Sequence, residues 1–251
     1  MPKSPSRVQY ATDDLPGGDR IVRSVGLEEI GQKEIGARVS ARRDHDWDHQ
    51  VMGILDFVAR YVLRTGARIL PNETLRYGWT LLRFLERTPA LLESHEIEDV
   101  YSHDPQPAMV PGVDRAIRLG QAADDVMRRN HLSGTGDFPY RGTLCLSCVH
   151  LAQMPPRQFF MERAEPNNSD DSGWLIDCGV KREEHEANDL SVGHLAHVAA
   201  DRPFLVPYLT MPIGCAVAFD KDGAIVFPLQ GADGHRDPAD PYEFGPRNIL
   251  G

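Results

Sequence analysis

Apolar side chains recur at helical spacing in two segments of the N-terminal half of the chain. The first segment is followed by Gly66, a common stop for a helix, and preceded by aspartates that favour a helix start. The second extends from Val113 to Asn130, with Arg128 and Arg129 at the end where the helix dipole favours cations. The pattern predicts two amphipathic helices, the first with apolar positions Val51, Ile54, Leu55, Val58, Val62 and Leu63.

Four segments around these helices are rich in β-branched and aromatic residues and are predicted as strands. They are residues 20–27, 34–40, 73–85 and 91–98. Thr88 and Pro89 predict a turn between the last two, which should pair as antiparallel neighbours. The adjacent leucines Leu81 and Leu82 would equally suit a helix.

The C-terminal half alternates between strand-like and turn-like segments. Strands are predicted over residues 142–150, 159–165 and 173–178. Asn188 and Asp189 offer capping side chains for a helix over residues 190–200. Residues 214–227 predict a hairpin, because Gly223 supplies the positive φ that a tight turn between twisted strands requires.

Glycines and small polar residues at positions 131–137 indicate a boundary between two domains. We expect a flexible leader over residues 1–18, an N-terminal α+β domain of unknown role over 19–137, a second α+β domain over 141–231 and a loop-like tail over 232–251. The predicted fold class is α+β, with two small domains, each a mainly antiparallel sheet with one or two packed helices.

Charge is unevenly distributed along the chain. The formal net charge is -10, and 41% of the residues are hydrophobic, enough for a core in a chain of 251 residues. Residues 141–251 hold 9 basic and 16 acidic side chains, a net charge of -7. Such a surface repels nucleic acid and anionic lipid and attracts a basic partner.

Four cysteines are too few for a disulfide framework, and the polar start of the chain lacks the apolar core of a signal peptide. We therefore expect a cytoplasmic protein. The longest apolar stretch, from Phe204 to Phe219, contains Pro207, Pro212 and Gly214 and is shorter than the roughly 20 residues that span a bilayer. We expect no membrane segment.

Two clusters have the residue types of a metal site. Cys145 and Cys148 form a Cys-x-x-Cys pair, but residues three apart on a strand point to opposite faces, so we interpret both as structural. His45 and His49 flank aspartates that a helix start also explains. Cys178 and Cys215 are interpreted as small buried residues. We expect no catalytic residue, metal or cofactor.

Acidic side chains gather in two polar segments of the second domain. We interpret them as a surface that binds a protein partner, formed by Glu165, Asp170, Asp171, Glu183, Glu184 and Glu186. Three residues are interpreted as structural anchors instead. Gly173 marks a turn or close backbone approach, Trp174 a buried core position, and Gly223 the hairpin turn.

Several short motifs follow one another between Leu144 and Phe227, about a third of the chain. They are an opening strand with cysteine and serine, Glu165-Pro, Asp171-Ser-Gly-Trp174, a turn, a short helix, and Pro212-Ile-Gly214 leading into Ala218-Phe-Asp220. In this order they resemble the bacterial immunity protein 33 family, long catalogued as a domain of unknown function. The sequence departs from the family pattern after Cys178, where Gly179-Val-Lys-Arg182 replaces a mostly acidic turn.

The resemblance implies a function without chemistry. The family is associated by gene neighbourhood with polymorphic toxin systems, so membership implies neutralisation of a toxin by direct binding, and an acidic surface suits a basic toxin. The family defines no catalytic residues.

An enzyme or small-ligand protein is the alternative. Its site would lie between the two domains and use histidines with an acidic neighbour. The candidates are His185, His194 and His197 with Glu183 or Glu186. An enzyme requires these groups in one pocket, whereas a binding protein requires an exposed acidic face.

Overall fold

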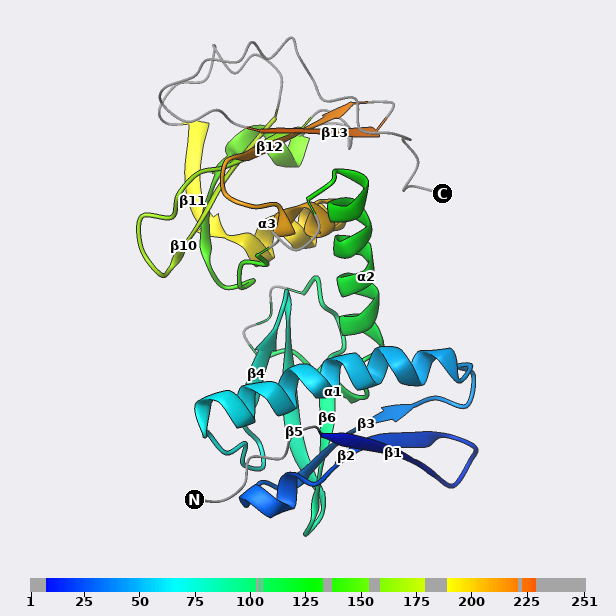
Figure 1. Cartoon of the computed structure of the whole chain (residues 1–251). Helices are drawn as coiled ribbons and strands as arrows, with labels where there is room; N and C mark the ends of the chain where they lie inside the picture. The colour runs from blue at the N-terminus through cyan, green and yellow to red at the C-terminus, as the bar shows by residue number, and fades with distance from the viewer. Residues whose placement is uncertain are drawn as a thin grey trace. The chain divides into compact units, whose positions relative to one another are not determined.

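The computed structural model in Figure 1 describes residues 8–102, 104, 106–132, 137–153, 159–178, 189–220 and 223–228. Contacts divide the chain into two compact units. The first comprises Met1–Val100 with Asp104–Arg118, and the second Tyr101–His103 with Leu119–Gly251. The domain boundary predicted at residues 131–137 falls within the second unit and stays a prediction. Each unit has its own sheet, which confirms the predicted α+β class.

Within the described residues, the sheet of the first unit has seven strands. They are β1 (Gln9–Asp14), β2 (Arg20–Val25), β3 (Glu34–Val39), β4 (Thr74–Tyr77), β5 (Thr80–Thr88), β6 (Leu91–Ile97) and β7 (Met109–Pro111). The strand order is β1-β2-β3-β6-β5-β4, with β7 beside β6, and only the β3–β6 pair is parallel among these strands.

Two long helices belong to the predicted pattern. Helix α1 (Asp46–Thr65) packs against β2 and β3 through its apolar stripe, and Gly66 ends it with a left-handed φ of 69°. Figure 1 shows α1 lying across the strands of this sheet. Helix α2 (Asp114–Arg129) begins in the core of the first unit, where Val113, directly before it, and Ala116 in its first turn are buried. Both predicted helices are confirmed. Apolar residues every three or four positions form one face of a helix, and that face is buried here.

The structure differs from the sequence expectation at two places in the first unit. Residues 9–14, expected in an irregular leader, form β1 and pair along their whole length with β2. The long strand expected over residues 73–85 is wrong, because β4 and β5 pair as a hairpin. Gly78 makes the turn with a φ of 52°, and Trp79 turns inward to 1% exposure. The predicted pairing across Thr88 and Pro89 is confirmed, since β5 and β6 are antiparallel.

The sheet of the second unit has six strands among the described residues. They are β8 (Leu144–Cys148), β9 (Phe159–Arg163), β10 (Asp171–Asp177), β11 (Leu190–His194), β12 (Cys215–Asp220) and β13 (Gly223–Pro228). Their order is β11-β8-β10-β9-β12-β13, and β8 and β10 are parallel. The predicted hairpin is confirmed by the antiparallel β12–β13 pair, with Gly223 at a φ of 143°.

The prediction of a helix over residues 190–200 is wrong for the first half of this segment and confirmed for the second. Leu190–His194 is strand β11, paired with β8, and only Leu195–Asp201 is helical, as α3. Val192, which is β-branched, and Gly193 both disfavour a helix. Strand β8 offers this segment backbone hydrogen bonds as an antiparallel neighbour. The 3-10 segment η5 (Pro203–Thr210) follows α3 and packs against it.

One face of this second sheet forms the core of its unit. Met161, Ile176, Val217 and Val226 lie side by side across four strands and are at most 2% exposed. Rings from η5 cover the neighbouring positions, where Phe204 packs between Phe159 and Phe219 at centroid distances of 5.7 and 5.5 Å. The strand ends and loops around this core carry the candidate functional residues.

None of the helices in the described part of the chain combines the length and apolarity that crossing a membrane requires.

Candidate functional site

An acidic loop joins β9 to β10. Glu165 and Asp170 are exposed in it, and the β9–β10 pairing fixes both ends of the loop. Asn168 orders the loop from inside, because its side-chain Oδ1 accepts a hydrogen bond from the Asp170 N–H at 2.9 Å. This bond between a side chain and the backbone helps to hold the loop in shape, and Glu165 and Asp170 are exposed on its surface.

Asp171 has a different role from the other two loop acids. Its Oδ2 accepts hydrogen bonds from the backbone N–H and the side-chain amide of Asn167, at 2.9 and 2.8 Å. Its Oδ1 accepts one from the Gly173 N–H at 2.8 Å. The backbone N–H of Asn167 is the main cause that lowers the pKa of Asp171. The carboxylate that the sequence placed on the binding surface thus organises the loop that carries it.

Gly173 and Trp174 fix the start of β10. The φ of Gly173 is 75°, and a Cβ there would lie 2.1 Å from the carbonyl oxygen of Ala164. Trp174 is 2% exposed, and its indole N–H donates to the carbonyl of Leu209 at 3.3 Å. Trp174 is therefore enclosed in the core, and the backbone at Gly173 leaves no room for a side chain.

Arg163, at the end of β9, is a buried cation with 2% exposure. It donates hydrogen bonds to the carbonyls of Ser172, Asp137 and Met211 at 3.2, 2.7 and 2.7 Å. Burial lowers the pKa of the guanidinium, and the carboxylate of Asp137, 3.2 Å away, acts in the opposite direction. These groups compensate the positive charge of Arg163 inside the unit.

A second arginine of this unit is buried as well. Among the described residues between 141 and 228, the basic side chains are Arg141, Arg163 and Arg202, and the first two are only 6% and 2% exposed. The exposed acids of this part are Glu165, Asp170 and Asp201. Two of the three arginines that the structure describes in residues 141–228 are thus internal, whereas these three acids are exposed.

The remaining predicted partner contacts, Glu183, Glu184 and Glu186, lie outside the described residues, as does His185. His194 and His197 are exposed at the start of α3, with ring centroids 5.5 Å apart in an edge-on arrangement. These two histidines of the enzyme hypothesis lie together on the surface.

The cysteines form a cluster that sequence reasoning missed. Cys145 and Cys148 lie three residues apart on β8, which directs their side chains to opposite faces, and burial raises the pKa of Cys145 to about 12. Cys148 instead meets His150 and Cys178, and the ligand atoms of these three side chains all lie within 4.8 Å of one another. The sequence signal that was overlooked is Cys148-x-His150. Cys178 joins these two residues because β10 runs parallel to β8 and ends at the same edge of the sheet.

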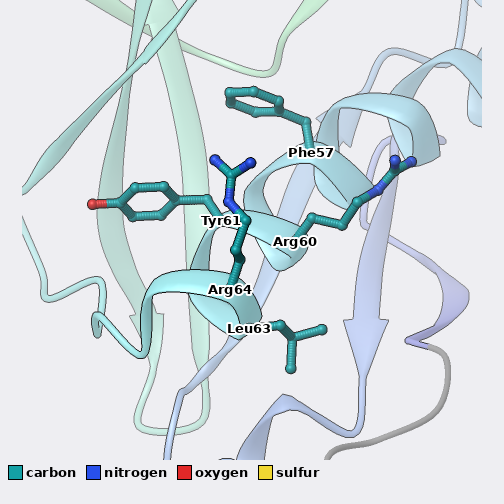
Figure 2. A pocket seen from close by; sticks show the side chains of 5 residues that line it. All are labelled: Phe57, Arg60, Tyr61, Leu63 and Arg64. Atoms are coloured by element: carbon teal, nitrogen blue, oxygen red, sulfur yellow. The ribbon is translucent and has the colours of Figure 1, made fainter.

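A groove of about 580 Å³ lies on the first unit, along the second half of α1. Figure 2 shows the five side chains that line it, Phe57, Arg60, Tyr61, Leu63 and Arg64. Phe57 is 42% exposed and packs edge-on against Tyr77 at a centroid distance of 5.2 Å. The lining offers aromatic and cationic contacts and includes no carboxylate, thiol or imidazole.

The second unit thus has an α+β arrangement in which Arg141 and Arg163 are buried and the loop acids Glu165 and Asp170 are exposed. Residues 146–227 match the model of the Imm33-like domain. The match confirms the resemblance seen in the motifs for this part of the chain. The name of this domain points to an immunity protein. The chain has no match among curated proteins or solved structures.

Proposed function

We propose that this protein is an immunity protein that neutralises a basic bacterial toxin by direct binding, through the acidic surface of its Imm33-like domain. The observation that carries the proposal is the separation of charge in this domain. Arg141 and Arg163 are buried, whereas Glu165 and Asp170 project from an ordered loop. The match of residues 146–227 to the model of the Imm33-like domain supports the same proposal.

The loop acids act by long-range attraction. Exposed carboxylates raise the rate of association with a basic partner and select against acidic ones, and they contribute less to the lifetime of the complex. Their effect falls as salt increases, since the screening length is about 10 Å at 0.1 M and about 3 Å at 1 M. On this proposal the protein binds its partner in a stable complex and turns over no substrate.

Glu183, Glu184 and Glu186 extend the proposed surface in sequence. They add three acids within four residues, between the strand ending at Asp177 and the one beginning at Leu190. We include them in the binding surface because their segment is too polar for a core. Asp171 belongs to the surface only indirectly, through the loop conformation that it stabilises.

The test uses the protein encoded by the neighbouring reading frame as the binding probe. The full chain should capture it in a pull-down, and the association rate should fall steeply with salt. Reversal of Glu165 and Asp170 to lysine, or of Glu183, Glu184 and Glu186 to lysine, should slow association and leave folding unchanged. The double variant Glu28→Lys, Glu29→Lys is the matched control, because both side chains are exposed in the first unit.

Absence of a complex with the neighbouring gene product would contradict the proposal. Equal association rates for the parent and both loop variants would contradict the assignment of the surface. If the association rate fell as much in the control variant as in the Glu165 and Asp170 variant, the effect would come from net charge and not from the position of these acids.

A further inference from the structure

We infer that Cys148, His150 and Cys178 form a zinc site in the second unit. Two thiols and an imidazole are the ligand types that zinc prefers in proteins. The three side chains come from separate parts of the fold: Cys148 ends β8, His150 lies in the 3-10 segment η2 (Val149–Gln153), and Cys178 follows β10. This inference replaces the expectation that Cys148 and Cys178 are only small buried residues and that the chain holds no metal.

The distances fit a tetrahedral zinc ion. Zinc–sulfur and zinc–nitrogen bonds of about 2.3 and 2.0–2.1 Å place a sulfur and a nitrogen ligand about 3.6 Å apart, and two sulfurs about 3.8 Å apart. The Cys148 Sγ and the His150 Nδ1 are 3.3 Å apart. All three ligand atoms lie within 4.8 Å of one another. The 3.3 Å pair is about 0.3 Å closer than in a tetrahedral zinc site, and the 4.8 Å limit leaves the other two pairs at most about 1 Å beyond their ideal separations.

The local backbone explains how His150 reaches the site. On a continuing strand, residues 148 and 150 would be about 6.6 Å apart along one face, from a rise of about 3.3 Å per residue. The chain instead turns into η2 directly after Cys148, which folds His150 back toward the sulfur. In that turn the His150 backbone N–H donates to the Cys148 Sγ at 3.3 Å. Hydrogen bonds of this kind orient a metal ligand and stabilise the negative charge of a thiolate.

The sheet topology explains how Cys178 reaches the site. Strands β8 and β10 are parallel neighbours, with Leu175 beside Leu146 and Ile176 beside Ser147. Their C-terminal ends therefore lie at the same edge of the sheet. Cys148 and Cys178 are each 2% exposed, so the two sulfurs are shielded from solvent, whereas His150 is only half-buried and lines the outer side. Three protein ligands leave one of zinc's four tetrahedral positions to a further ligand.

The chemistry of the donor set makes the site dependent on pH. Zinc binds thiolates and a neutral imidazole, so binding of the ion releases protons from thiols and acid favours release of the ion. Because the ligands connect the end of β8 to the end of β10, the bound ion would stabilise the folded second unit by mass action.

The experiment measures metal in the full chain purified without chelator. We expect about one zinc per chain, and replacement by Co²⁺ should produce the near-ultraviolet thiolate-to-cobalt absorption of a tetrahedral site. Cys148→Ser and Cys178→Ser should both lose the metal and this absorption. Cys145→Ser and Cys215→Ser are the matched controls, since both cysteines are buried outside the cluster and should keep the full signal.

His150→Ala is a second variant that is expected to fold, because this side chain is only half-buried. The variant should fold and bind Zn²⁺ more than about 100-fold more weakly than the parent, beyond what changes around a metal site usually cost. A chelator should lower the melting temperature of the parent and leave that of Cys148→Ser unchanged. Absence of zinc and cobalt binding in the parent, or equal binding by the cluster variants and the controls, would overturn the inference. A disulfide between Cys148 and Cys178 in the freshly purified protein, detected by mass spectrometry, would overturn it also.

Discussion

Buried carboxylates are more numerous in the first unit than among the described residues of the second. In the first unit the carboxylates of Glu34, Asp48, Glu93 and Glu96 are buried and bound to the fold. Asp48 accepts a hydrogen bond from the Arg20 guanidinium at 2.8 Å, and both oxygens of Glu96 accept backbone N–H groups at the start of α2. In the second unit the buried charges include Arg141 and Arg163, and the loop acids face outward.

This contrast separates stability from recognition. A buried carboxylate with its hydrogen bonds contributes to folding, and its loss leaves donors unsatisfied. An exposed carboxylate contributes little to folding and is available to a partner. Asp177 is the exception in the second unit, because it is 2% exposed and accepts the Cys178 N–H at 2.6 Å.

The largest effect should come from the two buried tryptophans, one in each unit. Trp174→Ala should lower the free energy of unfolding by about 3–5 kcal/mol, the cost of emptying a large aromatic site. Trp79→Ala is the matched change in the first unit, since Trp79 is 1% exposed and donates to the Val100 carbonyl at 2.9 Å. Chemical denaturation followed by circular dichroism measures both. A Trp174→Ala protein as stable as the parent would show that this residue is not a core anchor.

A smaller loss should follow from a single methyl group at the acidic loop. Gly173→Ala forces a side chain onto a φ of 75° and toward the Ala164 carbonyl. We expect a loss of about 1–3 kcal/mol from the strained backbone alone. Gly120→Ala, in α2, is the control, because nothing lies within 4 Å of the added methyl group and alanine favours helix. Equal melting temperatures for the two variants would contradict the close approach at Gly173.

The interior carboxylate of the first unit should matter more than its exposed neighbour. Glu96→Ala removes the acceptor for the backbone N–H groups of Arg115 and Ala116 and should cost about 0.5–2 kcal/mol, as the loss of a helix cap does. Glu98→Ala, two residues further on and exposed, should change stability by less than about 0.5 kcal/mol. Urea denaturation of both variants provides the comparison, and equal losses would contradict a capping role.

The contributions of Glu96 and Asp171 to stability should depend on pH in opposite directions. Burial raises the pKa of Glu96, so its contribution to stability is present at low pH and falls as the pH rises through the interval between its unfolded and folded values. The hydrogen bond from the Asn167 N–H lowers the pKa of Asp171, so its contribution is present above the unfolded value and falls as the pH decreases. Glu96→Gln should flatten the first trend and Asp171→Asn the second. Denaturation curves at a series of pH values would contradict this assignment if both substitutions left the profile unchanged.

The smallest effect on stability should come from the residues proposed to matter most for binding. Glu165→Lys and Asp170→Lys should each change the free energy of unfolding by less than about 0.5 kcal/mol, because both side chains are exposed. Thermal melts check this, alongside the association measurements. Strong destabilisation would assign these acids to the fold and remove them from the proposed surface.

Sequence reasoning succeeded where a pattern was long and uninterrupted. The apolar stripe from Val51 to Val62 predicted α1, and the alternation around Gly223 predicted the β12–β13 hairpin. It failed where a short segment had two possible structures. Val192 and Gly193 lay within a predicted helix, but pairing with β8 made them a strand. Tertiary contacts decided this segment, and a single sequence does not display them.

The candidate site was predictable only in part, for the same reason. The acidic loop was visible as composition, but the use of Asp171 inside the loop and of Arg163 inside the unit depends on backbone positions. Cys178 is 30 residues from Cys148 in the sequence, and only the parallel pairing of β8 with β10 brings them to one edge. Spacing rules detect ligands that are close in sequence, and this cluster is assembled by topology.

Arg163 has a further consequence, for the dynamics of the second unit. Its guanidinium joins the segment before β8, the start of β10 and the segment before β12, through Asp137, Ser172 and Met211. Local opening of any of these segments would leave a buried positive charge with unsatisfied donors, which is more costly than the loss of one hydrogen bond between neutral groups. The amide hydrogens of the three segments should therefore exchange with solvent as one cooperative group, although 74 residues separate Asp137 from Met211.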